Sequence, residues 1–369
     1  MATVVMPSGD VAIVGAGLVG LATAAALAAR GANVTLITTH HPGEASRAAA
    51  GMLAPGMESG TGPATTFALA ARDLYPSYIE ALAEMTGTMV PLNREGVLEL
   101  FADPEDAARR QSGPFSNGAQ WLTTAQLRDL EPALAPVAGA VLYPLDGAVD
   151  NVELVRALHT MAQSNPGISI VEEAATGVEL DGVRPAVRLS SGATVDADVV
   201  VVAAGAWTPG LAGLPRPLPV EPIRGQMISL DAAPLRHVAY SDHGYIVPRD
   251  ATRSVVGSTM EHAGFDSHTT AEGLAQLGAV AVSICPGLAA ARTLDRWSGL
   301  RPVTPDLLPI LGPDPDVEAL YYACGHSRNG ILLGPLSGEC VAALIAGEIP
   351  ALDLSPFSVS RFSRSPITV

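Results

Sequence analysis

The stretch VAIVGAGLVGLATAAALAARGANVTLI, residues 11–37, decides the fold of this chain of 369 residues. It contains a short apolar run at 11–14, a longer apolar segment at 18–30 that stops before Gly31, and another apolar run at 33–37. A short run without polar alternation is typical of a buried parallel strand, and glycine commonly ends a helix. The stretch therefore predicts a strand, a helix and a second strand in one β-α-β unit.

The turn between the first strand and the helix has the sequence Gly15-Ala16-Gly17-Leu18-Val19-Gly20. In this spacing the first glycine permits a tight turn, the second lets the backbone approach a pyrophosphate, and the third lets the helix pack closely on the sheet. The free N–H groups at the start of the helix then bind the phosphates. Because the motif follows a strand and opens a helix, it predicts a dinucleotide site rather than a simple turn.

One feature of such sites is missing. Dinucleotide-binding units usually carry Asp or Glu at the end of the second strand, where the carboxylate binds the ribose hydroxyls. This chain has Thr38 there, followed by Thr39. A hydroxyl can form one hydrogen bond with the ribose but no charged, bidentate contact, and Glu44 is an alternative source of the carboxylate. The ribose ligand therefore stays open, and Thr38 keeps an NAD(P) enzyme among the alternatives.

A second glycine-rich unit lies near the other end of the chain, at residues 321–347. Gly325 and Gly330 follow a predicted strand and precede a predicted helix that starts at Ile331. Reduced flavin carries negative charge, which the N-terminus of a helix stabilises. Two such helix entries in one chain favour FAD; the alternative is a tight entry to a C-terminal helix that binds nothing.

Composition excludes several classes of function. The formal net charge of −16 argues against binding to nucleic acid or to anionic membrane surfaces. The basic residues are all arginines, so no lysine can form a Schiff base or activate oxygen, and an anionic substrate needs a local arginine. Cys285, Cys324 and Cys340 are too widely spaced for a disulfide framework or a zinc site, and the histidines show no metal-ligand spacing. We expect a cytoplasmic protein without a signal peptide, membrane segment or metal, which forms a homo-oligomer.

The remaining elements suggest one discontinuous domain with another inserted into it. We predict an FAD-binding domain from residues 1–85, 145–215 and 300–369, and a substrate domain from residues 86–144 and 216–299. Strands are predicted at residues 96–101, 139–143, 168–171, 178–180, 186–189, 194–202, 224–230, 245–248, 253–257 and 319–323, and helices at 75–85, 152–163, 271–283 and 331–346.

Ordered motifs over nearly the whole chain carry a family resemblance. They are VAIVGAGLVG (11–20), SRAAAGMLAP (46–55), VVVAAGAWT (200–208), YSDHGYIVPR (240–249), VVGSTM (255–260), RWSGLRPVTPD (296–306) and GHSRNGILLGP (325–335). Through them the chain resembles the glycine oxidase branch of the FAD-dependent D-amino-acid oxidase family, which includes the ThiO enzyme of thiamine synthesis. The resemblance implies an α/β fold, in which a Rossmann-type FAD-binding domain carries an inserted α+β substrate domain built on a large antiparallel sheet.

The resemblance also implies the residues that contact FAD. Besides the first glycine motif, Thr38 and Thr39, it implies a flavin and ribityl wall made of Ser46, Arg47, Ala49, Gly51, Met52 and Leu53. The flavin would be wrapped from the other side by Gly325, His326, Arg328, Asn329, Gly330, Ile331 and Leu332. Ala175 would lie near the adenine. Ala204, Gly205 and Trp207 complete the set, although Trp207 taken alone is most often a core residue.

For the substrate, the resemblance implies that Arg301 binds the carboxylate, that Tyr245 donates a hydrogen bond to it, and that Arg328 lies close by. Taken alone, these residues are a structural arginine, a core tyrosine and a surface arginine. Met52 and Met260 would form the wall. Sarcosine oxidases of the same superfamily have an oxygen-activating lysine where this chain has Met260, and a flavin-linking cysteine near Gly299, so we expect non-covalent FAD.

The expected reaction is oxidation of glycine, an N-substituted glycine or another small amino acid. Hydride passes from Cα to flavin N5, the imine is hydrolysed, and O2 is reduced to H2O2. The step needs orientation more than a protein base. The alternative is an FAD-dependent dehydrogenase that passes electrons to a quinone or carrier; Arg301 and Tyr245 argue against a non-catalytic FAD subunit. A glycine-rich segment at residues 59–66, with Ala54 and Gly56 nearby, could widen the entrance for a larger N-substituent.

Overall fold

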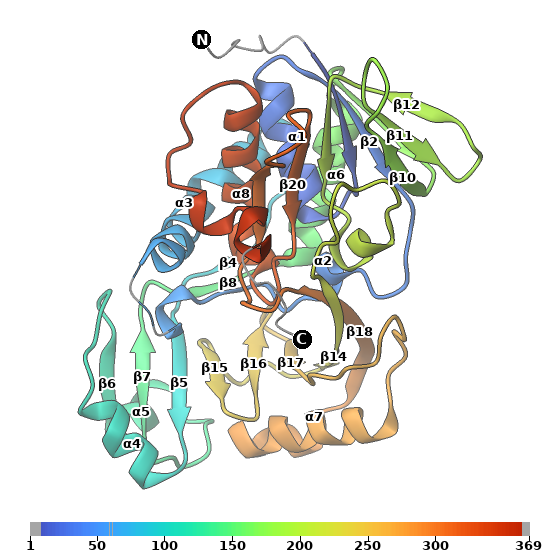
Figure 1. Cartoon of the computed structure of the whole chain (residues 1–369). Coiled ribbons are helices and arrows are strands. Elements are labelled where there is room, and N and C mark those ends of the chain that lie inside the picture. The colour runs from blue at the N-terminus through green and yellow to red at the C-terminus, as the bar shows by residue number, and fades with distance from the viewer. Residues whose placement is uncertain (1–8, 59, 61, 364–369) are drawn as a thin grey trace, which may run out of the picture.

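The computed structural model describes residues 9–58, 60 and 62–363, and two large sheets dominate it (Figure 1). The upper sheet in Figure 1 has six strands in the order β19-β20-β13-β1-β2-β9. The strands pair in parallel except for the antiparallel edge pair of β19 and β20. Their bounds are β1 (Asp10–Val14), β2 (Asn33–Thr38), β9 (Ile168–Glu172), β13 (Val199–Val202), β19 (Ile310–Pro313) and β20 (Leu320–Cys324).

Both faces of this sheet are covered, which explains why its strands are continuous apolar runs. One face shares a hydrophobic core with α1 (Leu18–Ala29), α3 (Pro63–Thr86), α6 (Asn151–Ser164) and α8 (Gly330–Ile345). The other face packs against a three-stranded antiparallel sheet, seen at the upper right of Figure 1, made of β10 (Ala175–Glu179), β11 (Ala186–Leu189) and β12 (Thr194–Asp196).

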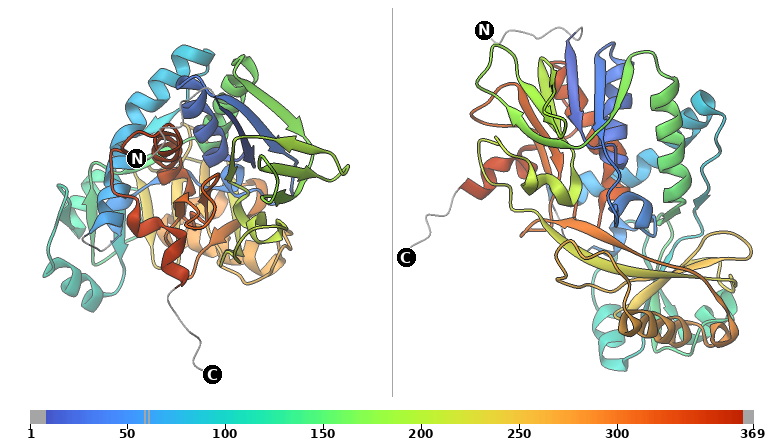
Figure 2. Two further views of the ribbon diagram at one scale, coloured as in Figure 1. Left: turned by 45° about the horizontal axis from the view of Figure 1, so that its top comes forward. Right: turned by 90° about the vertical axis from the view of Figure 1, so that its right-hand side faces the viewer.

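The lower sheet has eight strands in the order β18-β14-β17-β16-β15-β5-β7-β6. Its neighbours pair antiparallel except for the parallel pair of β15 and β5. Helix α7 (Ala271–Ile284) packs on the face that points away from the upper sheet (Figures 1 and 2). The strands are β5 (Val97–Phe101), β6 (Gln120–Thr123), β7 (Gly139–Tyr143), β14 (Glu221–Leu230), β15 (Val238–Ser241), β16 (Gly244–Pro248), β17 (Ser254–Gly257) and β18 (Thr293–Val303).

Short elements connect the two large sheets. A third sheet has the order β3-β8-β4, and small helices lie near it and at the edges of the molecule. These elements are β3 (Met52–Leu53), β4 (Leu92–Asn93), β8 (Gly147–Val149), α2 (Ala45–Ala48), α4 (Pro104–Gln111), α5 (Thr124–Leu130) and the 3₁₀ helices η1 (Pro55–Met57), η2 (Gly205–Gly210), η3 (Pro286–Ala290), η4 (Ser355–Phe357) and η5 (Val359–Ser363).

The predicted fold class is confirmed: a parallel Rossmann-type sheet stands above a large, mostly antiparallel one. The predicted single strand at 194–202 is wrong, because its first half pairs with β11 and its second half with β1. The predicted helix at 75–85 is the second half of α3, and β18, α4 and α5 were not predicted. The division into domains stays a prediction; β18 crosses its boundary at residue 300.

Within the described ranges, no helix combines the length and the apolar character that a membrane crossing requires. The expectation about a signal peptide falls on residues 1–8, which lie outside the described residues. So do Ser59 and Thr61 of the glycine-rich segment that was expected to form a rim.

Candidate active site

A cavity of about 1520 Å³ is lined by residues of both large sheets. It is larger than the roughly 300–1,000 Å³ of an ordinary small-molecule pocket. At one end it reaches the carboxyl ends of β2 and β9, where Thr38 and Glu172 line it. At the other end it reaches the lower sheet, where Tyr245 and Arg301 line it. A cavity of this size and length can hold a dinucleotide with a small substrate beside it.

Two helices point their N-termini into this cavity. Helix α1 starts after Gly17 and helix α8 after Asn329, and neither N-cap residue forms a side-chain hydrogen bond to its helix. At α1 the backbone N–H of Leu18 donates to Ser46 Oγ over 3.0 Å. Other N–H groups of the first turns have no partner within their helix, so they suit anionic groups. The two N-termini therefore fit the two anionic parts of FAD, the pyrophosphate and the reduced flavin.

Most residues predicted to contact the cofactor line this cavity, and three do not. Gly20, Leu53 and Leu332 lie behind its wall. A Cβ on Gly20 would lie 1.9 Å from the carbonyl oxygen of Gly15, so this glycine permits close packing of the helix on the turn. The residues that line the cavity are Gly15, Ala16, Gly17, Leu18, Val19, Thr38, Thr39, Ser46, Arg47, Ala49, Gly51, Met52, Ala175, Ala204, Gly205, Trp207, Gly325, His326, Arg328, Asn329, Gly330 and Ile331.

Polar side chains, among them the buried Asn151, fix the backbone of residues 46–48 against the cavity. The side-chain amide of Asn151 donates to the carbonyl oxygens of Ser46 and Arg47 over 2.8 and 3.1 Å. Trp297 Nε1 donates to the carbonyl of Ala48 over 2.9 Å, and Arg249 donates to Asn151 Oδ1 over 2.5 Å. Sequence reasoning missed Asn151 and Arg249, because these contacts arise only when distant segments meet.

The candidate substrate end is built on neighbouring strands of the lower sheet. Tyr245 on β16 pairs with Gly257 on β17, which in turn pairs with Met227 on β14. The Tyr245 side chain crosses Gly257 and brings its hydroxyl within 3.6 Å of Met227 Sδ. A Cβ on Gly257 would lie 2.5 Å from that hydroxyl, so the absence of a side chain here makes room for the phenol.

The Arg301 side chain approaches the Gly257 region from β18, the strand on the other side of β14. Its guanidinium lies over Gly225 of β14, where a Cβ would come within 2.2 Å of Nη1. Nη2 donates to Ser258 Oγ over 2.5 Å, and Nη1 donates to the carbonyl of Thr259 over 3.2 Å. Arg301 therefore reaches Ser258 while the Tyr245 hydroxyl lies over the preceding residue, Gly257. The structure brings a cation and a hydroxyl donor together beside one cavity.

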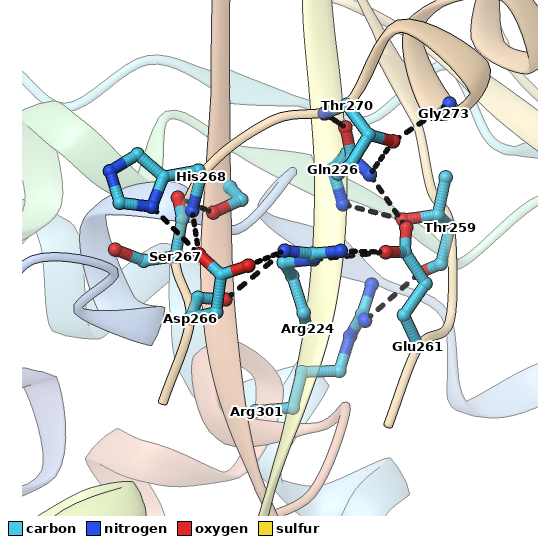
Figure 3. A network of polar contacts seen from close by, with 11 residues as sticks. Arg224, Gln226, Thr259, Glu261, Asp266, Ser267, His268, Thr270, Gly273 and Arg301 are labelled. Carbon is cyan, nitrogen blue, oxygen red and sulfur yellow. Dashed lines mark hydrogen bonds and ion pairs between the residues drawn. The ribbon is translucent and has the colours of Figure 1, made fainter. Parts of the chain in front are cut away.

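The segment that carries Ser258 and Thr259, the partners of Arg301, is held on β14 by a clamp of contacts around Arg224 (Figure 3). Arg224, which is buried, pairs with Glu261 and donates to Asp266 Oδ2 over 2.7 Å. Two residues along the strand, the backbone N–H of Gln226 donates to Thr259 Oγ1 over 2.8 Å. The backbone N–H and imidazole of His268 lower the pKa of Asp266 to about 2, so the clamp is charged at neutral pH.

Arg328 and Met260 lie at the mouth of the cavity. Arg328 Nη2 lies 3.2 Å from Glu58 Oε1, which also accepts a hydrogen bond from Asn329 Nδ2 over 2.8 Å. The Arg328 side chain is 54% exposed, and Met260 is 71% exposed. Arg328 is thus paired with a carboxylate at the rim, and its expected place close to Arg301 stays a prediction.

Two buried groups beside the cavity are uncharged at neutral pH. Burial lowers the pKa of His326 to about 3, and its Nε2 lies 3.0 Å from Ser337 Oγ. Burial raises the pKa of the Cys324 thiol to about 12. Over the described ranges, no three His, Cys, Asp or Glu side chains come together in a way that could hold a metal ion.

A signal for part of the missed site was present in the sequence. Gly225 is a single glycine inside a strand and Gly257 ends one, and a glycine in a strand pattern indicates close approach of another group. No local pattern marked Ser258 or Thr259 as partners of Arg301, because their contact depends on the register of β14, β17 and β18. Glu172 carried no signal either, since it is the last residue of an otherwise ordinary strand.

Comparison with known proteins agrees with this geometry. The family model described as FAD dependent oxidoreductase matches residues 10–344. The glycine oxidase of Geobacillus kaustophilus is 36% identical over 365 residues, which cover 95% of this chain and 97% of that protein. The crystal structure of glycine oxidase from that organism superposes with a TM-score of 0.89 and 35% identity, over 96% of this chain and 98% of the other.

Two further similarities bear on function. The crystal structure of iminodiacetate oxidase from Chelativorans sp. BNC1 has a TM-score of 0.86 and 30% identity, over 94% of this chain and 98% of the other. The bifunctional protein ThiO/ThiG of Trichormus variabilis is 34% identical over 97% of this chain, which spans only 56% of that protein. The match over almost the whole chain, together with the cavity and its two helix N-termini, shows that the chain belongs to the FAD-dependent oxidoreductase family that includes the glycine oxidases.

Proposed function

We propose that this chain is an FAD-dependent oxidase of glycine, an N-substituted glycine or another small amino acid. The observation that carries the proposal is the convergence of Arg301 and Tyr245 over Gly257 and Ser258, at the end of the cavity remote from Thr38. A guanidinium can grip a carboxylate through two parallel hydrogen bonds, and a phenol can donate a third. The same pair of side chains has no carboxylate partner among the described residues.

The protein's part in the reaction is to orient the substrate. Arg301 and Tyr245 would hold the carboxylate, which leaves Cα and the amine directed toward the body of the cavity. Bound FAD would supply the redox chemistry, by accepting a hydride from Cα and passing the electrons to O2 to give H2O2. His326 is uncharged at neutral pH, so this side chain adds no cation to compete for the substrate carboxylate.

The open end of the cavity supports substrates with an N-substituent. Met260 lines the cavity and is mostly exposed, so a group on the amine has a route to solvent. Iminodiacetate, named for the relative with a TM-score of 0.86, is itself an N-substituted glycine. Glycine and N-alkyl glycines are therefore the substrates to compare first.

The cofactor is proposed to be non-covalent. Gly299 lines the cavity and offers no nucleophile, and of the three cysteines only Cys324 lines it. The raised pKa of that thiol keeps it protonated at neutral pH, and a thiol is a far weaker nucleophile than a thiolate. Denaturing the yellow protein should release FAD into the supernatant; flavin that stays with the precipitate would contradict this point.

The function is tested by purifying the full chain and recording two measurements. The absorption spectrum should show oxidised flavin, and glycine, sarcosine or a longer N-alkyl glycine should produce H2O2 with matching consumption of O2. D-amino acids extend the series. Absence of flavin, or absence of turnover with every amino acid offered, contradicts the proposal. Turnover with an artificial electron acceptor but not with O2 assigns the chain to the dehydrogenases instead.

A further inference from the structure

The adenosine end of the cavity lacks a carboxylate where one is expected. In dinucleotide-binding folds an acidic residue at the end of the second strand binds the ribose hydroxyls. Here β2 ends at Thr38, which lines the cavity and offers only a hydroxyl. A single neutral hydrogen bond is weaker than a hydrogen bond to an ionised acceptor. The fold therefore leaves the two vicinal hydroxyls of a ribose without their usual partner at this position.

The neighbouring strand supplies a carboxylate at the same level. Strand β9 runs parallel to β2, and Glu172, its last residue, pairs with Thr38, the last residue of β2. Ile168 and Val34, which form another pair in this ladder, both belong to the core beneath the helices. Side chains alternate along strands, so Glu172 and Thr38 project to that same side. Adjacent strands lie roughly 4.8 Å apart, a distance that a glutamate side chain can span.

Glu172 also faces the cavity and is not engaged elsewhere. It lines the cavity together with Ala174 and Ala175, and its side chain is exposed. It forms no hydrogen bond or ion pair within the described part of the chain. The two acidic neighbours differ in this respect. Glu44 accepts from the backbone of His41 over 3.1 Å and lies 3.1 Å from His40 Nδ1, and Glu173 accepts from Ser190 over 3.0 Å.

We propose that Glu172 is the carboxylate that binds the adenosine ribose of the cofactor, in place of the acidic residue missing at Thr38. The two oxygens of one carboxylate can accept from both vicinal hydroxyls. The carboxylate would then lie on β9 instead of β2, one strand further along the same sheet edge. The Thr38 hydroxyl would remain available to bond to the same ribose. This inference rests on the proposed function, because it requires that the cavity binds FAD.

The test measures the affinity of the full-length holoenzyme for FAD. Protein is diluted through the range of its dissociation constant, and release of FAD is followed by the rise of free flavin fluorescence. Glu172→Gln keeps the size of the side chain and removes its charge, so we expect the dissociation constant to rise about tenfold. Glu173→Gln removes the same charge one residue away, where the carboxylate faces Ser190, and should leave the constant unchanged.

Two further variants identify the acceptor. Thr38→Glu restores the carboxylate on β2, and in the Glu172→Gln background it should recover most of the lost affinity. Glu44→Gln should change the dissociation constant less than Glu172→Gln. If Glu44→Gln has the larger effect, or if Glu172→Gln binds FAD as tightly as the unmodified chain, the assignment of Glu172 is overturned.

An FAD analogue without the ribose 2′-hydroxyl separates binding to the sugar from a general effect of charge. The unmodified chain should bind this analogue about tenfold more weakly than FAD, whereas Glu172→Gln should hardly distinguish the two. Equal discrimination by both proteins would contradict a contact between Glu172 and the ribose. The proposed function fails separately, if the unmodified chain binds no flavin at all.

Discussion

Arg301 is the side chain on which binding of the substrate is proposed to depend. The chain carries a net charge of −16, so a carboxylate is repelled at long range and needs a fixed cation near the flavin. Arg301→Ala should keep FAD, because the polar contacts of this side chain go to Ser258 and the carbonyl of Thr259, which are not among the residues expected to hold the cofactor. It should cost about 3–5 kcal/mol in kcat/KM, the range for removing one partner of a buried charge pair.

Two matched variants make this measurement specific. Arg301→Lys should recover only part of the loss, because an ammonium group cannot form the bidentate contact. Arg296→Ala changes an exposed arginine on the same strand, β18, and should leave kcat/KM unchanged. If Arg301→Ala turns over within a few-fold of the unmodified enzyme, this arginine does not hold the substrate and the amino-acid function must be withdrawn.

Gly225 controls where the guanidinium of Arg301 can lie. A Cβ at this position would come within 2.2 Å of Nη1 and 2.4 Å of Cζ, and both atoms belong to the end of a flexible side chain. Gly225→Ala should therefore leave the fold intact but push the guanidinium out of place, so that KM rises at least tenfold while flavin content is unchanged. Gly278→Ala, where nothing lies within 4 Å of the new methyl group, is the control. An unaltered KM in Gly225→Ala would show that Arg301 binds from another rotamer.

At the scale of elements, the strand β14 performs two tasks with alternating residues. Gly225 faces the cavity, whereas the side chains of Arg224 and Gln226 both donate to Glu261, in the segment that carries Ser258 and Thr259 (Figure 3). Replacing Arg224 with Met removes the cation between Glu261 and Asp266 and leaves two like charges beside each other. We expect the segment to loosen, KM to rise severalfold, and the affinity for FAD to stay the same.

The control for the clamp is Arg292→Met, which breaks an exposed ion pair with Asp231 at the far end of the same pair of strands. Surface pairs of this kind contribute about 0–1 kcal/mol, so neither stability nor KM should change. Arg224→Lys keeps the charge and should restore part of the substrate affinity. If Arg224→Met lowers the melting temperature while KM stays constant, the clamp is structural and does not position Arg301.

At the scale of the whole molecule, the sequence predicted what local patterns determine. The first β-α-β unit and the helix of the second glycine-rich unit were recognised because apolar periodicity and glycine spacing are local properties. Strand β18 was missed because residues 293–296 are exposed and show no alternation, so its strand conformation depends on pairing with β14. The partners of Arg301 and the position of Glu172 depend on sheet register, which brings together residues far apart in the chain.

The stability of the whole fold should depend on pH through His326, a buried residue of the cavity wall. An unfolded histidine has a pKa of about 6.5, whereas burial lowers that of His326 to about 3 in the folded chain. Between these values the unfolded state binds more protons, so stability from this group is complete above about pH 6.5 and is lost as the pH falls. At about 1.36 kcal/mol per pH unit, the change from pH 7.5 to 5.0 should cost about 2 kcal/mol.

Urea unfolding of the unmodified chain and of His326→Gln, at both pH values and with excess FAD, measures this cost. Glutamine can still bond to Ser337 but cannot take up a proton, so the free energy of unfolding of the unmodified chain should fall by about 2 kcal/mol more than that of the variant on acidification. Burial raises the pKa of Asp146 to about 6, so its contribution has the opposite sign and is lost as the pH rises through that value. Asp146 is present in both proteins and cancels in the comparison. An equal loss of stability in the two proteins would show that His326 is protonated in the folded state near its ordinary pKa, and that the wall beside α8 is open to water.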